Sequence, residues 1–374
     1  MKTIPFKTPA FGYFPRPSFT NQVGKRMVEW GTNLALFAPR RYGKTTWVLL
    51  ELQPAAEVWK VDFAYINLWS DRSDPVGALA TGLEIAAGLR ADIGSTRTVQ
   101  GESRSGVFRA YARIGYPAVT TEIAVRVKAA MGALARRERR TLLVIDEFQA
   151  IAEADQARVA ISAFRTALEN HGDQIVALFT GSERSTLSSL FRSRTEPLLE
   201  QATLIDLPAL EEDFARDRAA ALRERTRIDL SEKDVLDAFA ILGRSPQLLN
   251  EALTELAVRA DLDLDAAVAE AIEARGAADY GAQLAALPDV DRALLTRIAI
   301  GKKLDSDLED LPWPYGTAEN RRMPRAQAAI KRLKRDGLID ERPDHQAGWV
   351  VADPLLQKWI CRFANVTGST LSAA

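Results

Sequence analysis

Residues 38–45 read Ala38-Pro39-Arg40-Arg41-Tyr42-Gly43-Lys44-Thr45, and this stretch decides the fold. It follows a short apolar run, residues 34–37, and precedes residues 46–52, which have helical character. Backbone N–H groups that curl at a helix N-terminus surround an anion, and the helix dipole favours its negative charge. We therefore predict a nucleotide-binding loop whose contacts come from Ala38, Pro39, Arg40, Arg41, Tyr42, Gly43, Lys44, Thr45 and Thr46.

Two side chains of this loop carry specific roles in the prediction. Lys44 would neutralise the β- and γ-phosphates of ATP, and the Thr45 hydroxyl would ligate Mg²⁺. Ala38 stands where such loops usually begin with glycine, a difference that matters only if this position needs a positive φ. The alternative is a basic surface loop without a ligand.

A second candidate motif is an acidic pair that follows directly after an apolar run. Residues 141–145 have the composition of a buried strand, and Asp146 and Glu147 follow directly. A P-loop ATPase places its second nucleotide motif at such a position. We predict that Asp146 holds Mg²⁺ and that Glu147 orients and polarises the attacking water. The alternative is an acidic turn that caps the following helix.

Four further polar residues are candidates for contacts with the γ-phosphate or its neighbourhood. Thr180 and Ser182 follow the apolar run 175–179, where a hydroxyl lies beside the γ-phosphate if this strand neighbours the acidic one; a helix N-cap is the alternative. Arg192 and Arg194 are candidate arginine fingers toward a neighbouring subunit, which would require a homo-oligomer, and surface arginines are the alternative.

The surrounding pattern predicts an α/β core with two further domains. Apolar runs at residues 34–37, 63–68, 142–145, 175–179 and 204–207 alternate with helical stretches, which is typical of a parallel sheet whose central strands are buried on both faces. Residues 94–116 lack periodicity and are read as a loop or insertion. We predict a P-loop core at 1–209, a helical lid at 210–286 and a winged-helix domain at 287–366, followed by a frayed tail at 367–374.

Composition limits the class of protein. The chain has 374 residues, 47% of them hydrophobic and 26% charged, as expected for a globular protein of more than one domain. A formal net charge of −1 provides no global attraction to nucleic acid or membrane. One cysteine and two histidines cannot supply a disulfide or a thiolate metal cluster. No apolar run reaches the length of a membrane span, and the expectation is a cytoplasmic protein.

Four motifs together resemble the archaeal-type ATPase family, a branch of the AAA+/STAND P-loop ATPases related to origin-recognition proteins. They are APRRYGKTT at 38–46, LLVIDEFQAI at 142–151, FTGSERSTLSSLF at 179–191 and GRSPQLL at 243–249, within a resemblance that spans about residues 19–360. The family implies an ATPase core, a lid and a C-terminal winged helix used as a nucleotide-controlled switch.

The resemblance also assigns regions of the site. It places Thr180 and Ser182 in the sensor region and Arg244 where a second sensor contacts phosphate from the lid; a solvated helix start is the alternative for Arg244. Two positions depart from the family pattern. Arg244 replaces the usual small residue after Gly243, and Phe19 is not followed by the usual arginine and glutamates.

A basic stretch near the C-terminus is the candidate nucleic-acid contact. Residues 321–335 carry seven lysines and arginines and no acidic residue, while Ala326, Ile330 and Leu333 mark an apolar helix face. We predict a recognition helix for double-stranded DNA with contacts from Arg325, Lys331, Arg332, Lys334 and Arg335. The alternative is a solvated helix that binds a protein partner.

Three functions are compatible with these features. The first is an ATPase switch that couples hydrolysis of ATP to double-stranded DNA or to a protein partner. The second is a non-hydrolysing nucleotide-binding adaptor that acts through protein contacts. The third is a small-molecule kinase, for which the sequence shows no second substrate pocket.

Overall fold

The computed structural model describes residues 10–90, 107–110, 123–152, 154, 156–259, 261–275, 280–302, 308–314, 317–341 and 348–366. The chain forms two compact units, and each is described by itself. Tyr13–Ala209 make up the sheet unit, whereas Phe11 and Gly12 belong with the residues from Leu210 onward in the helical unit. The predicted tail at 367–374 lies outside the described residues.

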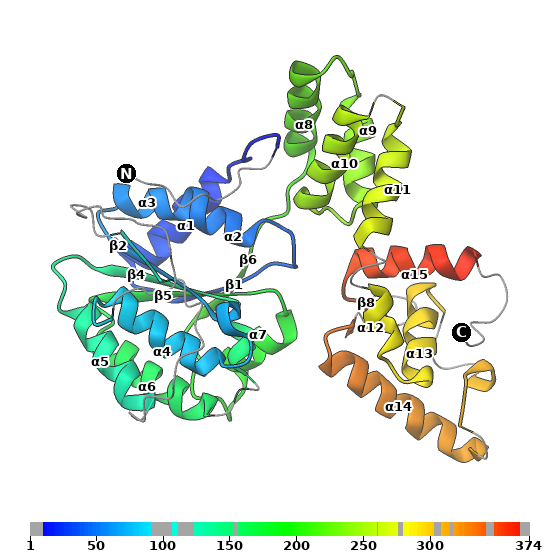
Figure 1. The fold of residues 1–374 in the computed structure, drawn as a ribbon. Coiled ribbons are helices and arrows are strands. Elements are labelled where there is room, and N and C mark those ends of the chain that lie inside the picture. Colours follow the sequence, from blue (N-terminus) through cyan, green and yellow to red (C-terminus); the bar gives the residue numbers. More distant parts are fainter. Residues whose placement is uncertain are drawn as a thin grey trace. The chain divides into compact units, whose positions relative to one another are not determined.

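The sheet unit is built on six parallel strands (Figure 1). Their order is β3-β2-β4-β5-β1-β6, and β1 therefore lies between β5 and β6. The strands are β1 Leu34–Phe37, β2 Asp62–Asn67, β3 Val107–Ala110, β4 Thr141–Asp146, β5 Ile175–Gly181 and β6 Thr203–Asp206. The loop after β1 thus meets the carboxyl ends of β5 and β4 at one edge of the sheet, because all strands run in the same direction.

The predicted fold class is confirmed, with two corrections to the strands. The prediction that the last strand is buried like the central ones was wrong: β6 is an edge strand with exposed or half-buried residues, paired with β1 alone among the described strands. The reading of residues 94–116 as a loop was wrong at 107–110, where β3 pairs with β2. Residues 107–110 read Val-Phe-Arg-Ala, and the arginine interrupts the continuous apolar run by which the other strands were recognised. The rest of that segment lies outside the described residues.

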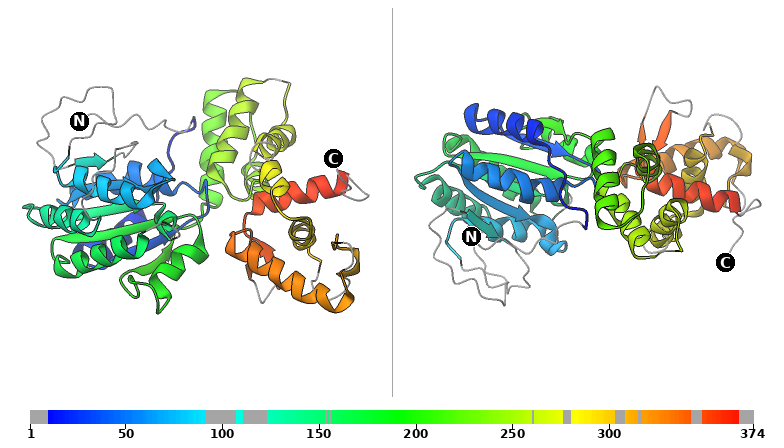
Figure 2. Two further views of the ribbon diagram at one scale, coloured as in Figure 1. Left: turned by 60° about the horizontal axis from the view of Figure 1, so that its bottom comes forward. Right: turned by 90° about the horizontal axis from the view of Figure 1, so that it is seen from above.

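Helices cover both faces of the sheet (Figures 1 and 2). One face carries α1 Pro17–Gly24, which continues as a π-helical turn η1 Lys25–Glu29, together with α2 Lys44–Trp47, the π-helical turn η2 Val48–Leu52 and α3 Gln53–Val58. The other face carries α4 Pro75–Ala86, α5 Ile123–Ala135 and α6 Ala157–Asn170. Short 3₁₀ turns, η3 Leu68–Asp71 and η4 Phe148–Ile151, follow β2 and β4, and α7 Arg184–Arg192 follows β5.

The helical unit begins with the elements predicted as a lid. They are α8 Glu212–Arg225, α9 Glu232–Ile241, α10 Pro246–Val258, α11 Leu264–Arg275 and α12 Gly281–Ala285. Two of these helices have side-chain caps that fix where they begin: Ser231 and Asp234 form a reciprocal capping box at α9, and Ser245 caps α10 before Pro246. Buried Leu, Val and Phe side chains from α8, α9 and α10 form their shared core.

The remaining elements have the order of a winged helix. They are α13 Asp289–Ala299, η6 Leu308–Asp310, α14 Glu319–Arg335, the antiparallel strands β7 Ile339–Glu341 and β8 Trp349–Val351, and α15 Pro354–Val366. Ala326, Ala329 and Leu333 on α14 are buried, so the apolar face predicted for this helix is present. Ile330, placed on that face by the sequence, is half-buried.

Candidate functional site

The loop after β1 has the backbone conformation of an anion-binding nest. Arg41 and Gly43 both have positive φ, 70° and 87°, and α2 begins at the next residue, Lys44. Alternation of left-handed and right-handed residues turns successive N–H groups toward a common centre. Ala38 is not among the residues with positive φ, so an alanine can stand there without strain.

The loop is fixed to the neighbouring strand at its first residue. The Ala38 N–H donates to the Gly181 carbonyl over 3.2 Å, which continues the β1–β5 pairing past the end of β1. A Cβ atom at Gly181 would lie 2.6 Å from Oε1 of Gln149, so a larger residue there would displace the Gln149 side chain. The loop and the carboxyl end of β5 are therefore held in register.

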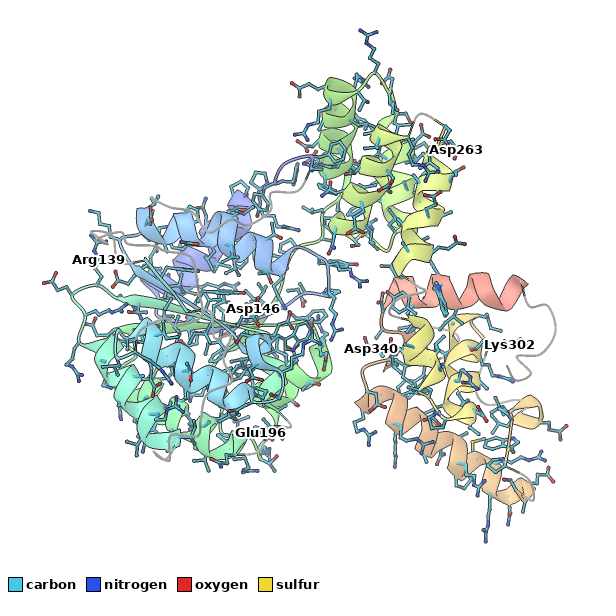
Figure 3. All side chains as sticks on the ribbon, in the orientation of Figure 1. Arg139, Asp146, Glu196, Asp263, Lys302 and Asp340 are labelled. Atoms are coloured by element: carbon cyan, nitrogen blue, oxygen red, sulfur yellow. The ribbon has the colours of Figure 1, made fainter. Side chains whose placement is uncertain are left out.

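Asp146 is completely buried at the end of β4 and accepts hydrogen bonds from three strands or helices. Its Oδ2 accepts from the hydroxyls of Thr45 (2.8 Å) and Tyr65 (2.7 Å), and its Oδ1 accepts from Thr180. Burial alone raises the pKa of Asp146, but the Lys44 ammonium, 3.5 Å away, and the three hydroxyl donors lower it below its ordinary value. Asp146 is thus held as a carboxylate in the interior of the sheet unit, whereas Arg139 lies at its periphery (Figure 3).

Glu147 is held in a left-handed conformation, with φ 56° and ψ 43°. Its Oε1 accepts from the Lys44 ammonium over 2.7 Å. Its Oε2 accepts from the Gln149 amide over 2.6 Å and from the Ser182 hydroxyl over 2.9 Å. Glu147 is only 8% exposed, so these three donors, and not bulk water, determine the position of its carboxylate.

An aromatic cluster supports both polar strand ends. Phe148 follows Glu147, and Phe179 precedes Thr180; their ring centroids are 4.6 Å apart. Phe191 of α7 packs on Phe179 at 4.9 Å. These rings are almost fully buried, and such packing fixes the main chain from which the carboxylates and hydroxyls project.

The structure brings the core of the predicted site together. Lys44, Thr45, Asp146 and Glu147 are joined by direct hydrogen bonds and ion pairs. Neither of the alternatives based on helix capping fits, because Glu147 at the start of η4 and Glu183 at the start of α7 make no side-chain cap, and Ser182 instead donates to Glu147. Thr180 is fully buried against Asp146, whereas Ser182 is half-buried.

The other arginines predicted for the site have different surroundings. Arg40 is exposed, lies 3.6 Å from Glu183 and stacks over the Trp69 ring at 4.8 Å. Arg192 and Arg194 are exposed at the end of α7 and just after it. Arg244 belongs to the helical unit, where it lies just before α10 with φ 56°. Its guanidinium is 3.5 Å from the carboxylate of Glu211. The roles of these arginines as fingers or sensor remain predictions.

Two residues that the sequence reasoning did not select belong to the site. Tyr65 on β2 donates to Asp146, and Gln149 on η4 donates to Glu147 and, over 3.2 Å, to Ser182. Oε1 of Gln149 is buried and without a hydrogen-bond partner. The DEFQ sequence at 146–149 was visible, but that the glutamine turns back onto the glutamate depends on the η4 turn.

The basic residues of α14 differ in exposure, and Arg332 is distinguished from the others by its pairing with a buried carboxylate. Lys331, Lys334 and Arg335 are exposed, with Lys334 over the Trp349 ring at 5.4 Å; Arg325 is exposed and donates to Thr317 over 2.7 Å. Arg332 forms two hydrogen bonds, 2.6 and 2.8 Å, with the buried carboxylate of Asp291 on α13. The Arg332 side chain therefore joins two helices and is a weaker candidate for DNA than its neighbours.

The donor set of the sheet unit suits a magnesium nucleotide. Mg²⁺ is held in phosphate-binding sites by one or two oxygen ligands from the protein together with phosphate oxygens. The Thr45 hydroxyl and the Asp146 carboxylate, 2.8 Å apart at the start of α2 and the end of β4, provide such oxygens. Among the described residues, no group of three or more His, Cys, Asp or Glu side chains forms a separate metal site.

Comparison with solved structures agrees with this arrangement. A Walker-type ATPase of Pyrococcus abyssi matches with a TM-score of 0.60 at 16% identity, covering 95% of this chain and 98% of that chain. The fold is that of a P-loop NTPase. The ORC2 protein of Aeropyrum pernix matches in its ADPNP–ADP complexes with a TM-score of 0.56 and in its ADP form with 0.52, both at 16% identity over 98% of this chain and 100% of that chain.

Two further comparisons bear on the limits of this likeness. No protein-family model matches the sequence, and no curated protein matches it. The similarity to archaeal Walker-type ATPases and origin-recognition proteins is therefore a similarity of fold, in agreement with the resemblance seen in the motifs. In the part of the chain that the structure describes, no helix combines the length and apolar character needed to cross a bilayer.

Proposed function

We propose that this chain is an ATP-binding and ATP-hydrolysing switch of the AAA+ type, with Mg²⁺ as its cofactor. The observation that carries the proposal is the convergence of Lys44, Thr45, Asp146 and Glu147 on one another at the carboxyl edge of the parallel sheet. Two solved structures of similar fold support it, since one is a Walker-type ATPase and the other an ORC2 protein with ADPNP and ADP.

The residues have separate roles in this reaction. The N–H groups around Gly43 bind the β-phosphate at the N-terminus of α2, and Lys44 binds the β- and γ-phosphate oxygens. Thr45 and Asp146 hold Mg²⁺, which neutralises charge that develops on the phosphates. Phosphate oxygens would therefore compete with Glu147 for the Lys44 ammonium, which lies 2.7 Å from Oε1 in this structure.

Release of Glu147 from Lys44 is the step that prepares the base. Oε1 then becomes available to orient and polarise a water molecule, while Oε2 stays bound to Gln149 and Ser182. The half-buried Ser182 hydroxyl, directly after β5, is the candidate sensor, and Thr180 keeps Asp146 in place. Arg192, Arg194 and Arg244 are the candidate contacts from a second copy or from the lid.

Phosphate release tests the proposal. We expect purified wild-type protein to hydrolyse ATP in Mg²⁺, and Glu147→Gln to bind ATP but to lose about 10²- to 10⁴-fold in turnover, since the amide cannot act as a base. Equal turnover in both proteins would remove Glu147 from the mechanism. Binding without phosphate release by the wild type would instead favour the non-hydrolysing adaptor.

The C-terminal elements favour double-stranded DNA as a partner of this switch. Arg325, Lys331, Lys334 and Arg335 are exposed on α14, next to the β7–β8 hairpin in the chain. A basic helix before a hairpin is the arrangement by which winged helices enter the major groove and contact phosphates. The same phosphate assay with duplex DNA added tests whether DNA changes the turnover.

A further inference from the structure

The chain crosses between its two units twice. A residue near the first crossing forms a hydrogen bond with a residue near the second. One passage is between Gly12 and Tyr13, and the other between Ala209 and Leu210. Within the sheet unit, Nε of Arg16 donates to the carbonyl of Pro208 over 3.3 Å. One side chain thus joins the two connections at their entry into the sheet unit.

The same guanidinium contacts the phosphate-binding loop. Nη2 of Arg16 donates to the Tyr42 carbonyl over 3.2 Å, and Nη1 lies 3.9 Å from the position that a Cβ atom on Gly43 would take. Arg16 is 9% exposed, and burial lowers the pKa of its guanidinium, although an arginine of this kind keeps its charge. A buried cation therefore lies directly against the main chain that binds phosphate.

The main chain around Arg16 is anchored to the helix that begins in the loop. Glu51 on η2 accepts from the Tyr13 hydroxyl (2.6 Å), the Arg16 N–H (2.7 Å) and the Thr20 hydroxyl (2.6 Å). Because η2 continues directly from α2, these hydrogen bonds tie Tyr13, Arg16 and Thr20 to the helix that begins at Lys44. The position of Arg16 is therefore determined by the loop's own helix.

The segment is also anchored on the other side of the first connection. In the helical unit, Nη1 of Arg218 on α8 donates to the Gly12 carbonyl over 3.1 Å, and Arg218 is 2% exposed. Phe11 is buried in the same unit, with the guanidinium of Arg225 on α8 over its ring at 5.5 Å. Only three residues separate Gly12 from Arg16 in the chain, so the two anchored points of the first connection are close in sequence.

We propose that Arg16 is a positioning residue that couples nucleotide occupancy of the loop to the two chain connections between the units. It senses the loop through the Tyr42 carbonyl and restrains the second connection through the Pro208 carbonyl. The proposal rests on the nucleotide binding proposed above. It assigns to the N-terminal segment a role beyond that of covering the sheet.

The test uses the full chain and its variants Arg16→Met and Arg16→Lys. Lysine keeps the charge but lacks the planar group that donates in two fixed directions. Equilibrium dialysis measures the affinity for ADP and for a non-hydrolysable ATP analogue. Amide hydrogen exchange is measured at residues 207–212 with and without nucleotide. Arg126→Met, which removes a half-buried ion pair with Glu84 elsewhere in the sheet unit, is the matched control.

In the wild type we expect nucleotide to slow hydrogen exchange at residues 207–212. Both Arg16 variants should lose this nucleotide-dependent change, and Arg16→Met should bind nucleotide about tenfold more weakly, whereas Arg126→Met should keep both properties. If Arg16 only stabilised the fold, the Arg16 variants would melt at a lower temperature but would keep the nucleotide-dependent change in hydrogen exchange at residues 207–212.

The contrary results are separable from failure of the proposed function. If the wild type binds no nucleotide, the proposed function fails first. If the wild type binds nucleotide but shows no change at 207–212, or if folded Arg16→Lys responds as the wild type does, the coupling role of Arg16 is overturned.

Discussion

Glu147 accepts hydrogen bonds from three side chains, and they leave its two oxygens in different situations. Oε1 has the ammonium of Lys44 as its partner, whereas Oε2 is held by the shorter side chains of Gln149 and Ser182. In the proposed mechanism Oε1 turns to water while Oε2 keeps both of its donors. Gln149 is therefore the residue expected to preserve the orientation of Glu147 after phosphate has taken Lys44.

Replacement of Gln149 should affect turnover more than binding. Gln149→Leu has a similar volume but removes a charge-assisted hydrogen bond of about 1.5–3 kcal/mol, so kcat should fall about 10- to 100-fold while the affinity for ATP changes little. Gln247→Leu, on the exposed surface of α10, is the control. An unchanged kcat in Gln149→Leu would show that Ser182 alone is sufficient.

At the residue scale the sequence predicted the residues that lie inside contiguous motifs. Lys44 and Thr45 follow the loop glycine, and Asp146 and Glu147 end an apolar run, so their spacing along the chain indicated their chemistry. Tyr65 could not be selected, because its contact with Asp146 depends on the pairing of β2 with β4. Such cross-strand contacts have no signal in a single sequence.

For helices and strands too, the sequence predicted features that depend on local pattern and missed those that depend on contacts between distant residues. The apolar spacing of α14 predicted its buried face, but all its basic residues were treated alike. The structure separates Arg332 from the others because α13 brings the buried Asp291 within 2.6 Å. The edge position of β6 and the pairing of β3 with β2 likewise depend on the order of the strands in the sheet. Apolar runs in the sequence carry no information about that order.

Loss of Arg332 should weaken the packing of α13 against α14. Arg332→Ala leaves Asp291, 1% exposed, without its guanidinium, and the expected cost is about 1–2 kcal/mol after allowance for the partly exposed arginine. Native-state hydrogen exchange in α13 and α14 measures this local stability. Arg335→Ala, an exposed neighbour, should change it by less than about 0.5 kcal/mol; equal effects of the two changes would refute the assigned role of the pair.

The whole molecule has a net charge of −1, so any attraction to DNA has to come from a local surface. Exposed basic side chains on α14 are the surface proposed for DNA, and the loop proposed to bind phosphate belongs to the other unit. The proposed switch requires that binding at one of these places influences binding at the other. The chain connections near Arg16 and Pro208 are the covalent routes for that influence.

Binding to duplex DNA should depend on salt and on α14. The double variant Lys331→Ala, Arg335→Ala should bind DNA more weakly for all sequences, and the slope of log K against log salt should become shallower by about 2, one for each phosphate contact. Fluorescence anisotropy at several salt concentrations measures both quantities. Arg223→Ala on α8 is the control, and equal slopes for all proteins would exclude α14 as the DNA contact.

Nucleotide binding by wild type and Lys44→Ala, compared by equilibrium dialysis with ATP and Mg²⁺, is the most direct measurement. The wild type should bind one ATP per chain, and Lys44→Ala should bind at least about tenfold more weakly, since it loses the charge that faces the β- and γ-phosphates. Equal affinity in the two proteins, or no binding by the wild type, would contradict a nucleotide site at the loop between β1 and α2.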